Sequence, residues 1–140
     1  MFGVVLVSHY RLAEEFYQAL RLIIGEVENF RPIGLDPDTP PEEMRLRIKK
    51  AIAEVDSGDG VLALVDMFGG TPSNLCLSFL EEGRVEVVTG LNLPMLVKMG
   101  RVREPMSLDE AARMARDYGR KNISVASDVL AGSDRPGDGE

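Results

Sequence analysis

Short, almost entirely apolar runs alternate along this chain with longer stretches whose apolar residues recur at helical spacing. The clearest runs are Phe2–Val7 and Val61–Val65. A continuous, valine-rich run of this length is typical of a strand that is buried on both faces of a parallel sheet. The alternation therefore predicts an α/β protein with a doubly wound open sheet, mostly parallel, and helices on both faces.

The other expected elements complete this alternating order. Pro32 lacks a backbone N–H, so we expect the strand that contains it to lie at an edge of the sheet. Thr39 and Glu42 fit a capping box at the start of one helix, and Ser107 fits the capping position of a later one. The predicted helices span residues 11–25, 39–55, 71–80, 92–99 and 107–118, and the further strands span 29–35, 85–89 and 122–126.

The length of 140 residues fits one domain that buries a sizeable core. We assign this domain to residues 1–131. Residues 132–140 are mostly Gly, Asp, Ser and Pro, which are too polar to pack, so we expect a disordered tail there.

The formal net charge of −7 narrows the range of partners. An acidic surface repels the phosphate backbone of nucleic acid and the headgroups of anionic lipid, so neither is an expected partner. One cysteine and one histidine exclude a disulfide and leave too few ligands for an ordinary zinc site. We see no secretory signal and no apolar run near the ~18 residues of a membrane span, so we expect a cytoplasmic protein.

Two polar side chains, His9 and Asp66, stand where the two most apolar strands are expected to end. Open α/β sheets bind ligands at the carboxyl ends of their strands, so we expect both side chains on one rim. A lone histidine in such a place is more often a hydrogen-bonded surface residue than a catalyst. The neighbouring carboxylate favours catalysis, because a carboxylate that accepts the Nδ1 proton leaves Nε2 free as a nucleophile.

A glycine-rich turn follows the second of these strands and leads into a helix. The ordinary interpretation is a tight connection between a strand and a helix. The same turn can also bind a phosphoryl group, because free N–H groups and hydroxyls gather at a helix N-terminus. The candidate phosphoryl-binding residues are Gly69, Gly70, Thr71 and Ser73.

Other chemistries lack support in the sequence. Cys76 has apolar neighbours in its expected helix, so we predict a packed thiol and not a reactive one. The chain contains neither the G-x-G-x-x-G pattern of dinucleotide sites nor the G-x-x-x-x-G-K-[ST] pattern of nucleotide-binding loops. We therefore expect no metal and no cofactor.

Three segments carry a resemblance to a known family. They are GVVLVSH at residues 3–9, LVDMFGGTPSN at 64–74 and VTGLNLPML at 88–96. With these segments in this order, the chain resembles the IIA component (EIIA) of the mannose-type sugar phosphotransferase system over residues 1–127. The resemblance implies a doubly wound sheet with an antiparallel last strand, in a protein that forms homodimers.

The resemblance also implies a phosphotransferase that works through phosphohistidine in phosphoenolpyruvate-dependent sugar transport. His9 would accept a phosphoryl group from phospho-HPr and pass it to a histidine of a IIB protein. Asp66 would orient His9, while Thr71 and the amides after Gly69 would hold the phosphoryl oxygens. A membrane would be involved only indirectly, through a permease complex. Tyr10 departs from the family, which usually has glycine there, and its side chain would narrow access or change which partner docks.

Two alternative functions use the same region of the chain. A receiver-type signalling module would be phosphorylated on Asp66, but it needs an acidic pair after the first strand to hold magnesium, and Ser8-His9-Tyr10 offers none. A regulatory phosphohistidine protein that serves no permease would have the same site as a transport component.

The expected last strand, residues 122–126, is the candidate for a dimer contact. It would lie at an edge of the sheet whose N–H and C=O groups are otherwise unpaired. Exchange of such an element between two protomers is a low-cost route to a homodimer.

Overall fold

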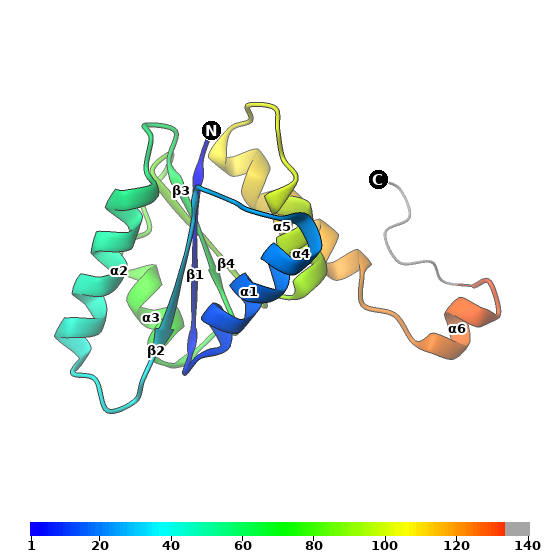
Figure 1. The fold of residues 1–140 in the computed structure, drawn as a ribbon, viewed down its shortest axis with the longest axis horizontal. Helices are drawn as coiled ribbons and strands as arrows, with labels where there is room; N and C mark the ends of the chain where they lie inside the picture. Colours follow the sequence, from blue (N-terminus) through cyan, green and yellow to red (C-terminus); the bar gives the residue numbers. More distant parts are fainter. Residues whose placement is uncertain (134–140) are drawn as a thin grey trace.

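The computed structural model describes residues 1–133, so residues 134–140 of the predicted tail lie outside the described range. Figure 1 shows a central sheet with helices on its two faces. Within residues 1–133, no helix is both long enough and apolar enough to cross a membrane. The described elements are β1 (Gly3–His9), α1 (Leu12–Ile24), β2 (Phe30–Leu35), α2 (Pro41–Val55), β3 (Val61–Val65), α3 (Gly70–Leu77), β4 (Val85–Thr89), α4 (Leu93–Gly100), α5 (Leu108–Lys121) and α6 (Ala126–Leu130).

The described strands form one parallel sheet in the order β2-β1-β3-β4. β2, which contains Pro32, lies at one edge, as predicted. The strand order reverses between β1 and β3, because the chain adds β2 on one side of β1 and β3 on the other. Val7 lies beside Val65 in this central pair, so the residues that follow reach the same rim. A rim at such a switch point is where open α/β sheets bind their ligands.

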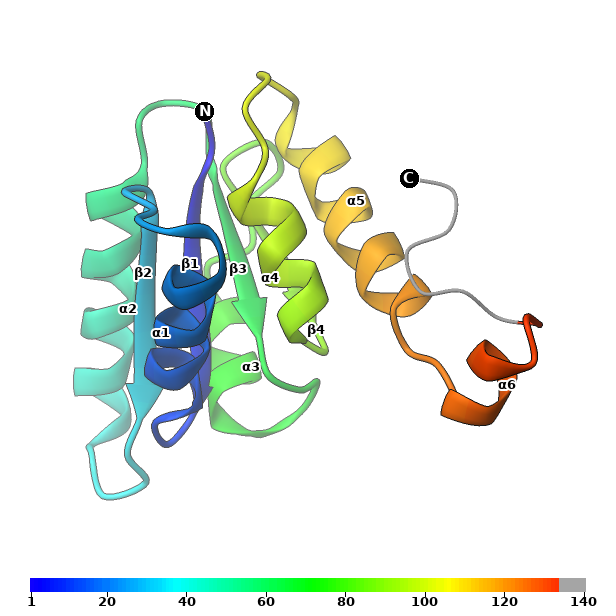
Figure 2. The same ribbon diagram turned by 45° about the vertical axis from the view of Figure 1, so that its right-hand side comes forward.

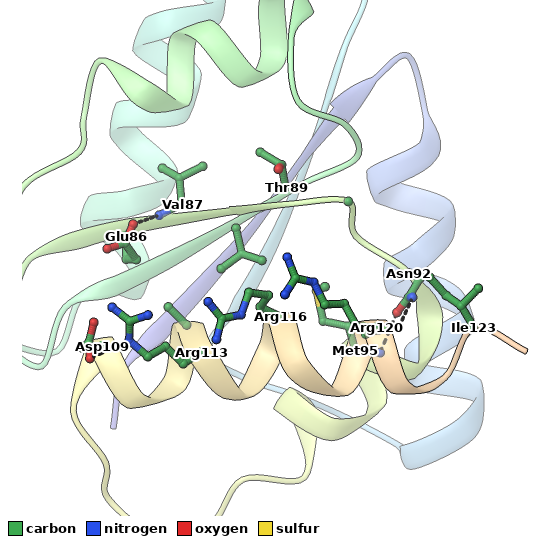
Figure 3. Close-up of a pocket in the computed structure, with 14 residues that line it drawn as sticks. Glu86, Val87, Thr89, Asn92, Met95, Asp109, Arg113, Arg116, Arg120 and Ile123 are labelled. Carbon is green, nitrogen blue, oxygen red and sulfur yellow. Dashed lines mark hydrogen bonds and ion pairs between the residues drawn. The ribbon is translucent and has the colours of Figure 1, made fainter. Parts of the chain in front are cut away.

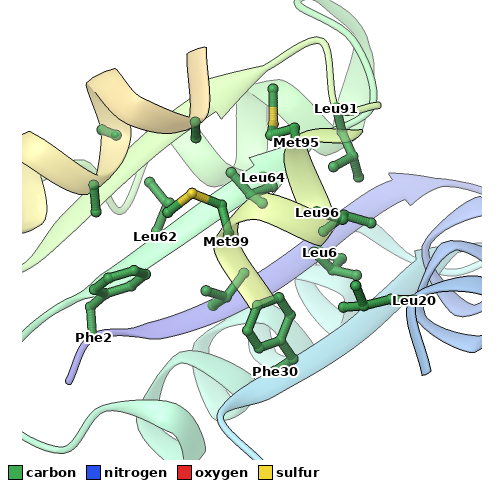
Figure 4. Packing of buried hydrophobic residues seen from close by; sticks show 14 of the residues in the cluster. Phe2, Leu6, Leu20, Phe30, Leu62, Leu64, Leu91, Met95, Leu96 and Met99 are labelled. Carbon is green, nitrogen blue, oxygen red and sulfur yellow. The ribbon is translucent and has the colours of Figure 1, made fainter. Parts of the chain in front are cut away.

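Successive residues of the central strands alternate between two hydrophobic cores. Leu6 and Leu64 belong to the core that the sheet shares with α1, α4 and α5, part of which Figure 4 shows. Val5 and Val7 belong to the opposite core, which the sheet shares with α2 and α3. Figures 1 and 2 show the same two layers of helices. The predicted doubly wound α/β architecture is therefore confirmed.

Helix capping agrees only in part with the prediction. Ser107 caps α5 as expected, since its side chain accepts the N–H of Glu110. The capping box predicted at Thr39 is wrong, because α2 follows Pro40 and has no side-chain cap. Pro40 occupies the N-cap position, which leaves Thr39 one residue too early to reach the free N–H groups of the first turn.

The predicted last strand at residues 122–126 is also wrong. α5 continues to Lys121, and α6 begins at Ala126 after a short irregular segment. The side-chain amide of Asn122 donates to the carbonyl of Tyr118 at 2.9 Å, which ends the helix. A strand needs a hydrogen-bonded neighbour, whereas both views show this segment leading away from the sheet (Figures 1 and 2). The described sheet is therefore entirely parallel, and β4 forms an open edge.

We expect Leu64→Ala to lower the free energy of unfolding by about 2–5 kcal/mol, because truncation of a core leucine leaves a cavity. Leu64 is fully buried in the centre of the sheet. Urea unfolding followed by circular dichroism measures the change. Leu22→Ala removes an exposed leucine from α1 and should change the free energy by less than about 0.5 kcal/mol. Similar losses in the two variants would contradict the core described above.

Candidate functional site

The structure places His9 and Asp66 side by side at the carboxyl ends of the two central strands. His9 is the last residue of β1, and Asp66 directly follows β3. The backbone N–H of Asp66 donates to the carbonyl of Val7 at 3.2 Å, which extends the pairing of β1 and β3 by one step. The centre of the sheet therefore fixes the relative position of the two side chains.

One carboxylate oxygen of Asp66 binds both the ring and the main chain of His9. Oδ2 lies 2.9 Å from Nδ1 of the imidazole and accepts the backbone N–H of His9, also at 2.9 Å. The other oxygen, Oδ1, accepts the N–H of Met67 at 3.0 Å. The side chain of Asp66 is 10% exposed and that of His9 is 47% exposed. The carboxylate is thus enclosed, whereas the imidazole reaches solvent.

This pairing gives the two ring nitrogens of His9 different roles. An ionised carboxylate only accepts hydrogen bonds, so Nδ1 carries the proton of the neutral imidazole. Nε2 then keeps a lone pair and is the nucleophilic atom of the ring. The arrangement can therefore form a covalent bond at Nε2 while the carboxylate balances the charge that the ring gains.

Nε2 of His9 lies against the start of α3. A Cβ atom added to Gly70 would lie 3.0 Å from Nε2 and 3.2 Å from Cε1 of the same ring. Gly69 and Gly70 have φ angles of +91° and +83°, in a region that residues with a Cβ seldom adopt. The two glycines turn the chain sharply, and the missing Cβ of Gly70 keeps the space beside Nε2 open.

α3 begins with backbone N–H groups that no side chain caps. Its N-cap residue is Gly69, and its first turn contains no acidic residue. The first N–H groups of a helix, together with the positive end of its dipole, bind phosphate and other anions. Thr71 is exposed in this turn. Ser73 is fully buried, and within residues 1–133 its hydroxyl has no hydrogen-bond partner.

Cys76 lies on the buried side of the same helix. Burial, aided by the negative charge of Asp66, raises the pKa of its thiol to about 12. The thiolate is the reactive form of cysteine, so a thiol that remains protonated at neutral pH is inert. The structure therefore agrees with a packing role for Cys76.

Sequence reasoning missed the residues that shape the loop after His9. Ser8 is fully buried, and its Oγ accepts the N–H of Ala13 at 2.7 Å and donates to the carbonyl of Tyr10 at 3.3 Å. Its hydroxyl therefore satisfies a free N–H in the first turn of α1 and holds the loop after His9 in place. Gly34 of β2 packs against the same loop, where a Cβ would lie 2.1 Å from the carbonyl oxygen of Tyr10. A serine shortly before a helical segment is a local signal for such a hydrogen bond, but no local signal marks Gly34.

Residues 1–133 contain no group of three or more His, Cys, Asp or Glu side chains that could hold a metal ion. A cavity of about 540 Å³ lies between β4 and α5 and contains none of the predicted site residues. In Figure 3, the side chains of Arg113, Arg116 and Arg120 extend from α5 towards β4. The cavity follows the open edge of the sheet.

Comparison with known proteins points to one family. The model of the EIIA-man family, described as "PTS system fructose IIA component", matches residues 3–116. The mannose-specific EIIAB component of Escherichia coli (strain K12) is 32% identical over 126 residues, which are 88% of this chain and 39% of that protein. The chain therefore spans less than half the length of that curated relative. The sorbose-specific EIIA component of Lacticaseibacillus casei is 33% identical over 110 residues, which are 76% of this chain and 78% of that protein.

A solved structure has the same fold. It is the PTS IIA protein associated with the fucose utilization operon of Streptococcus pneumoniae, with a TM-score of 0.78 and 28% identity. The superposition covers 91% of this chain and 95% of that chain. The relatedness seen in the sequences thus extends to the three-dimensional structure.

We expect the hydrogen bond to Asp66 to fix the tautomer of His9 in solution. Long-range ¹H–¹⁵N NMR spectra at mildly alkaline pH should show a protonated Nδ1 and an unprotonated Nε2. Asp66→Ala removes the acceptor, so part of the population should shift to the Nε2–H form. Glu82→Ala removes an exposed carboxylate before β4 and should leave the spectrum unchanged. The same tautomer in all three proteins would contradict the assigned role of Asp66.

Proposed function

The chain belongs to the EIIA-man family of phosphotransferase-system IIA components, and on that premise we propose that it is a cytoplasmic phosphocarrier that acts through phosphohistidine. It accepts a phosphoryl group on His9 from phospho-HPr and passes it to a IIB protein. One observation carries this proposal. Nδ1 of His9 is paired with Asp66, which leaves Nε2 beside the open start of α3.

The proposed transfer exchanges one phosphorus–nitrogen bond for another. The lone pair of Nε2 attacks the phosphorus of the phosphohistidine in HPr, and an Nε2–P bond forms. The donor's P–N bond breaks, and its electron pair returns to the donor imidazole. The ring of His9 keeps its Nδ1 proton, so the carboxylate of Asp66 balances the positive charge that develops on the ring. A histidine of the IIB protein then attacks the same phosphorus and releases His9.

The start of α3 holds the phosphoryl oxygens in this proposal. The contacts are the N–H groups of Gly69, Gly70, Thr71 and Ser73 and the hydroxyl of Thr71. These dipoles already face the space beside Nε2 in the folded chain, so little rearrangement is needed when the phosphoryl group arrives. The helix end itself supplies positive potential, and the scheme therefore requires no metal ion at this site.

Paired glycine variants test the space beside Nε2. Gly70→Ala and Gly69→Ala both place a Cβ at a positive φ, so both strain the backbone. Only the Cβ at Gly70 would meet Nε2, whereas a Cβ at Gly69 has nothing within 4 Å. We expect Gly70→Ala to slow labelling of His9 by radiolabelled phospho-HPr by at least about tenfold relative to Gly69→Ala, because the reacting atoms no longer align.

The wild-type protein and His9→Ala complete this experiment. Wild type should gain a phosphoryl group that is labile in acid, as phosphohistidine is. His9→Ala should gain none while its circular dichroism spectrum stays native. A label that survives acid, or one that maps to Asp66 or a hydroxyl, would contradict the proposal.

We also propose that two copies of the chain associate along the open edge of β4. The cavity between β4 and α5 follows this edge, where the N–H and C=O groups of β4 have no further strand as a partner in residues 1–133. Ile123 and Val125 are exposed in the segment after α5, and Leu130 is exposed in α6. A second copy would bury these side chains and cover the edge.

Two truncations test this homodimer. A chain that ends at Gly132 retains the segment after α5 and should remain dimeric by light scattering. A chain that ends at Lys121 lacks the exposed apolar side chains and should become monomeric or aggregate. Full-length protein that is monomeric at micromolar concentration would contradict the proposal.

A further inference from the structure

Tyr10 follows His9 and holds its backbone in a conformation that residues with a side chain seldom adopt. Its φ is +49°, and within residues 1–133 it is the one residue other than glycine with a positive φ. The left-handed region crowds the Cβ atom against a backbone carbonyl, so glycine is the ordinary choice there. Backbone strain of this kind is concentrated at functional sites.

The two neighbouring strands hold Tyr10 in this conformation. Its N–H donates to the carbonyl of Leu35 at 2.9 Å, and its own carbonyl accepts from Oγ of Ser8 at 3.3 Å. Gly34 has no side chain and so leaves room for this carbonyl. The backbone of Tyr10 is therefore fixed by β1 and β2, while the residue as a whole is 61% exposed.

Four exposed apolar residues follow the ends of the two central strands, two after β1 and two after β3. Tyr10 and Leu12 lie where β1 leads into α1, and Met67 and Phe68 lie where β3 leads into α3. The hydrogen bond from the imidazole of His9 to its carboxylate partner joins the two connections. We name these four residues, which are 50% to 72% exposed, the apolar rim. Exposed apolar residues that gather in one place are typical of surfaces that contact another protein.

The chemistry of His9 identifies the partner that covers the apolar rim. Under the proposed function, Nε2 must come within bonding distance of a phosphorus that another protein carries on a histidine. Even a transient protein contact buries up to about 600 Å² on each side, far more than one imidazole. The donor protein must therefore lie across both connections and contact the rim.

We infer that Tyr10 is a docking residue whose ring, together with the rest of the apolar rim, binds the phosphohistidine protein that donates to His9. The inference rests on the proposed function. Tyrosine is among the side chains that contribute most at protein contacts, because its large ring loses little conformational freedom on binding. Its ring helps to determine which phosphohistidine protein can dock, and it takes no part in the bond exchange at Nε2.

A comparison of two phosphoryl donors distinguishes an effect of Tyr10 on protein docking from an effect on phosphoryl transfer to Nε2. Phospho-HPr must dock on the apolar rim, whereas phosphoramidate is a small molecule that needs only access to Nε2. We expect Tyr10→Ala and Tyr10→Gly to raise the KM for phospho-HPr by about tenfold or more, with little change in kcat and an unchanged rate with phosphoramidate. Leu22→Ala is the matched control, because Leu22 is an exposed residue of α1 outside the rim, and it should behave as wild type with both donors.

Tyr10→Gly keeps the test decisive if Tyr10→Ala folds poorly, because glycine adopts the left-handed region freely. An unchanged KM in both variants would overturn the inference. A parallel loss with both donors would also overturn it, since Tyr10 would then act on the chemistry of His9.

A change in dimerisation instead of KM would assign the rim to a second copy of the chain. If wild type accepts a phosphoryl group from neither donor, the proposed function itself fails.

Discussion

The hydrogen bonds of one carboxylate oxygen hold the candidate site together. Oδ2 of Asp66 binds both the ring and the main chain of His9, and it thereby ties the ends of β1 and β3 to each other. The two residues are far apart in the sequence and meet only because the two strands are neighbours in one register. The geometry of the site therefore depends on the burial of the central strands, and the direction of Nε2 depends in turn on that geometry.

Much of this arrangement could be predicted from the sequence because its signals are local. The apolar runs that became β1 and β3 specify strands buried on both faces, and a parallel sheet places the ends of such strands on one rim. The glycine turn before α3 is equally local, since two consecutive positive φ angles need residues without a Cβ. These local signals were sufficient to predict the fold and the contact between His9 and Asp66.

The parts that could not be predicted depend on segments that are distant in the sequence. Residues 122–126 have the composition of a strand, but in one copy of the chain no neighbour pairs with them, and the capping amide of Asn122 ends α5 instead. Gly34 matters through its contact with the carbonyl of Tyr10, which lies on another connection. The left-handed backbone of Tyr10 is imposed by both neighbouring strands. Only the assembled structure shows these constraints.

The residues that hold the His9–Asp66 pair differ from those that form the surface around it, and this separation affects how sequences of this fold can change. His9 and its carboxylate partner are held by the ends of β1 and β3, whereas the residues of the apolar rim follow those strand ends. Side chains of the rim can be exchanged during evolution without disturbing the register of β1 and β3. Proteins of this fold can thus differ in the surface around the site while they keep the same pairing of histidine and carboxylate.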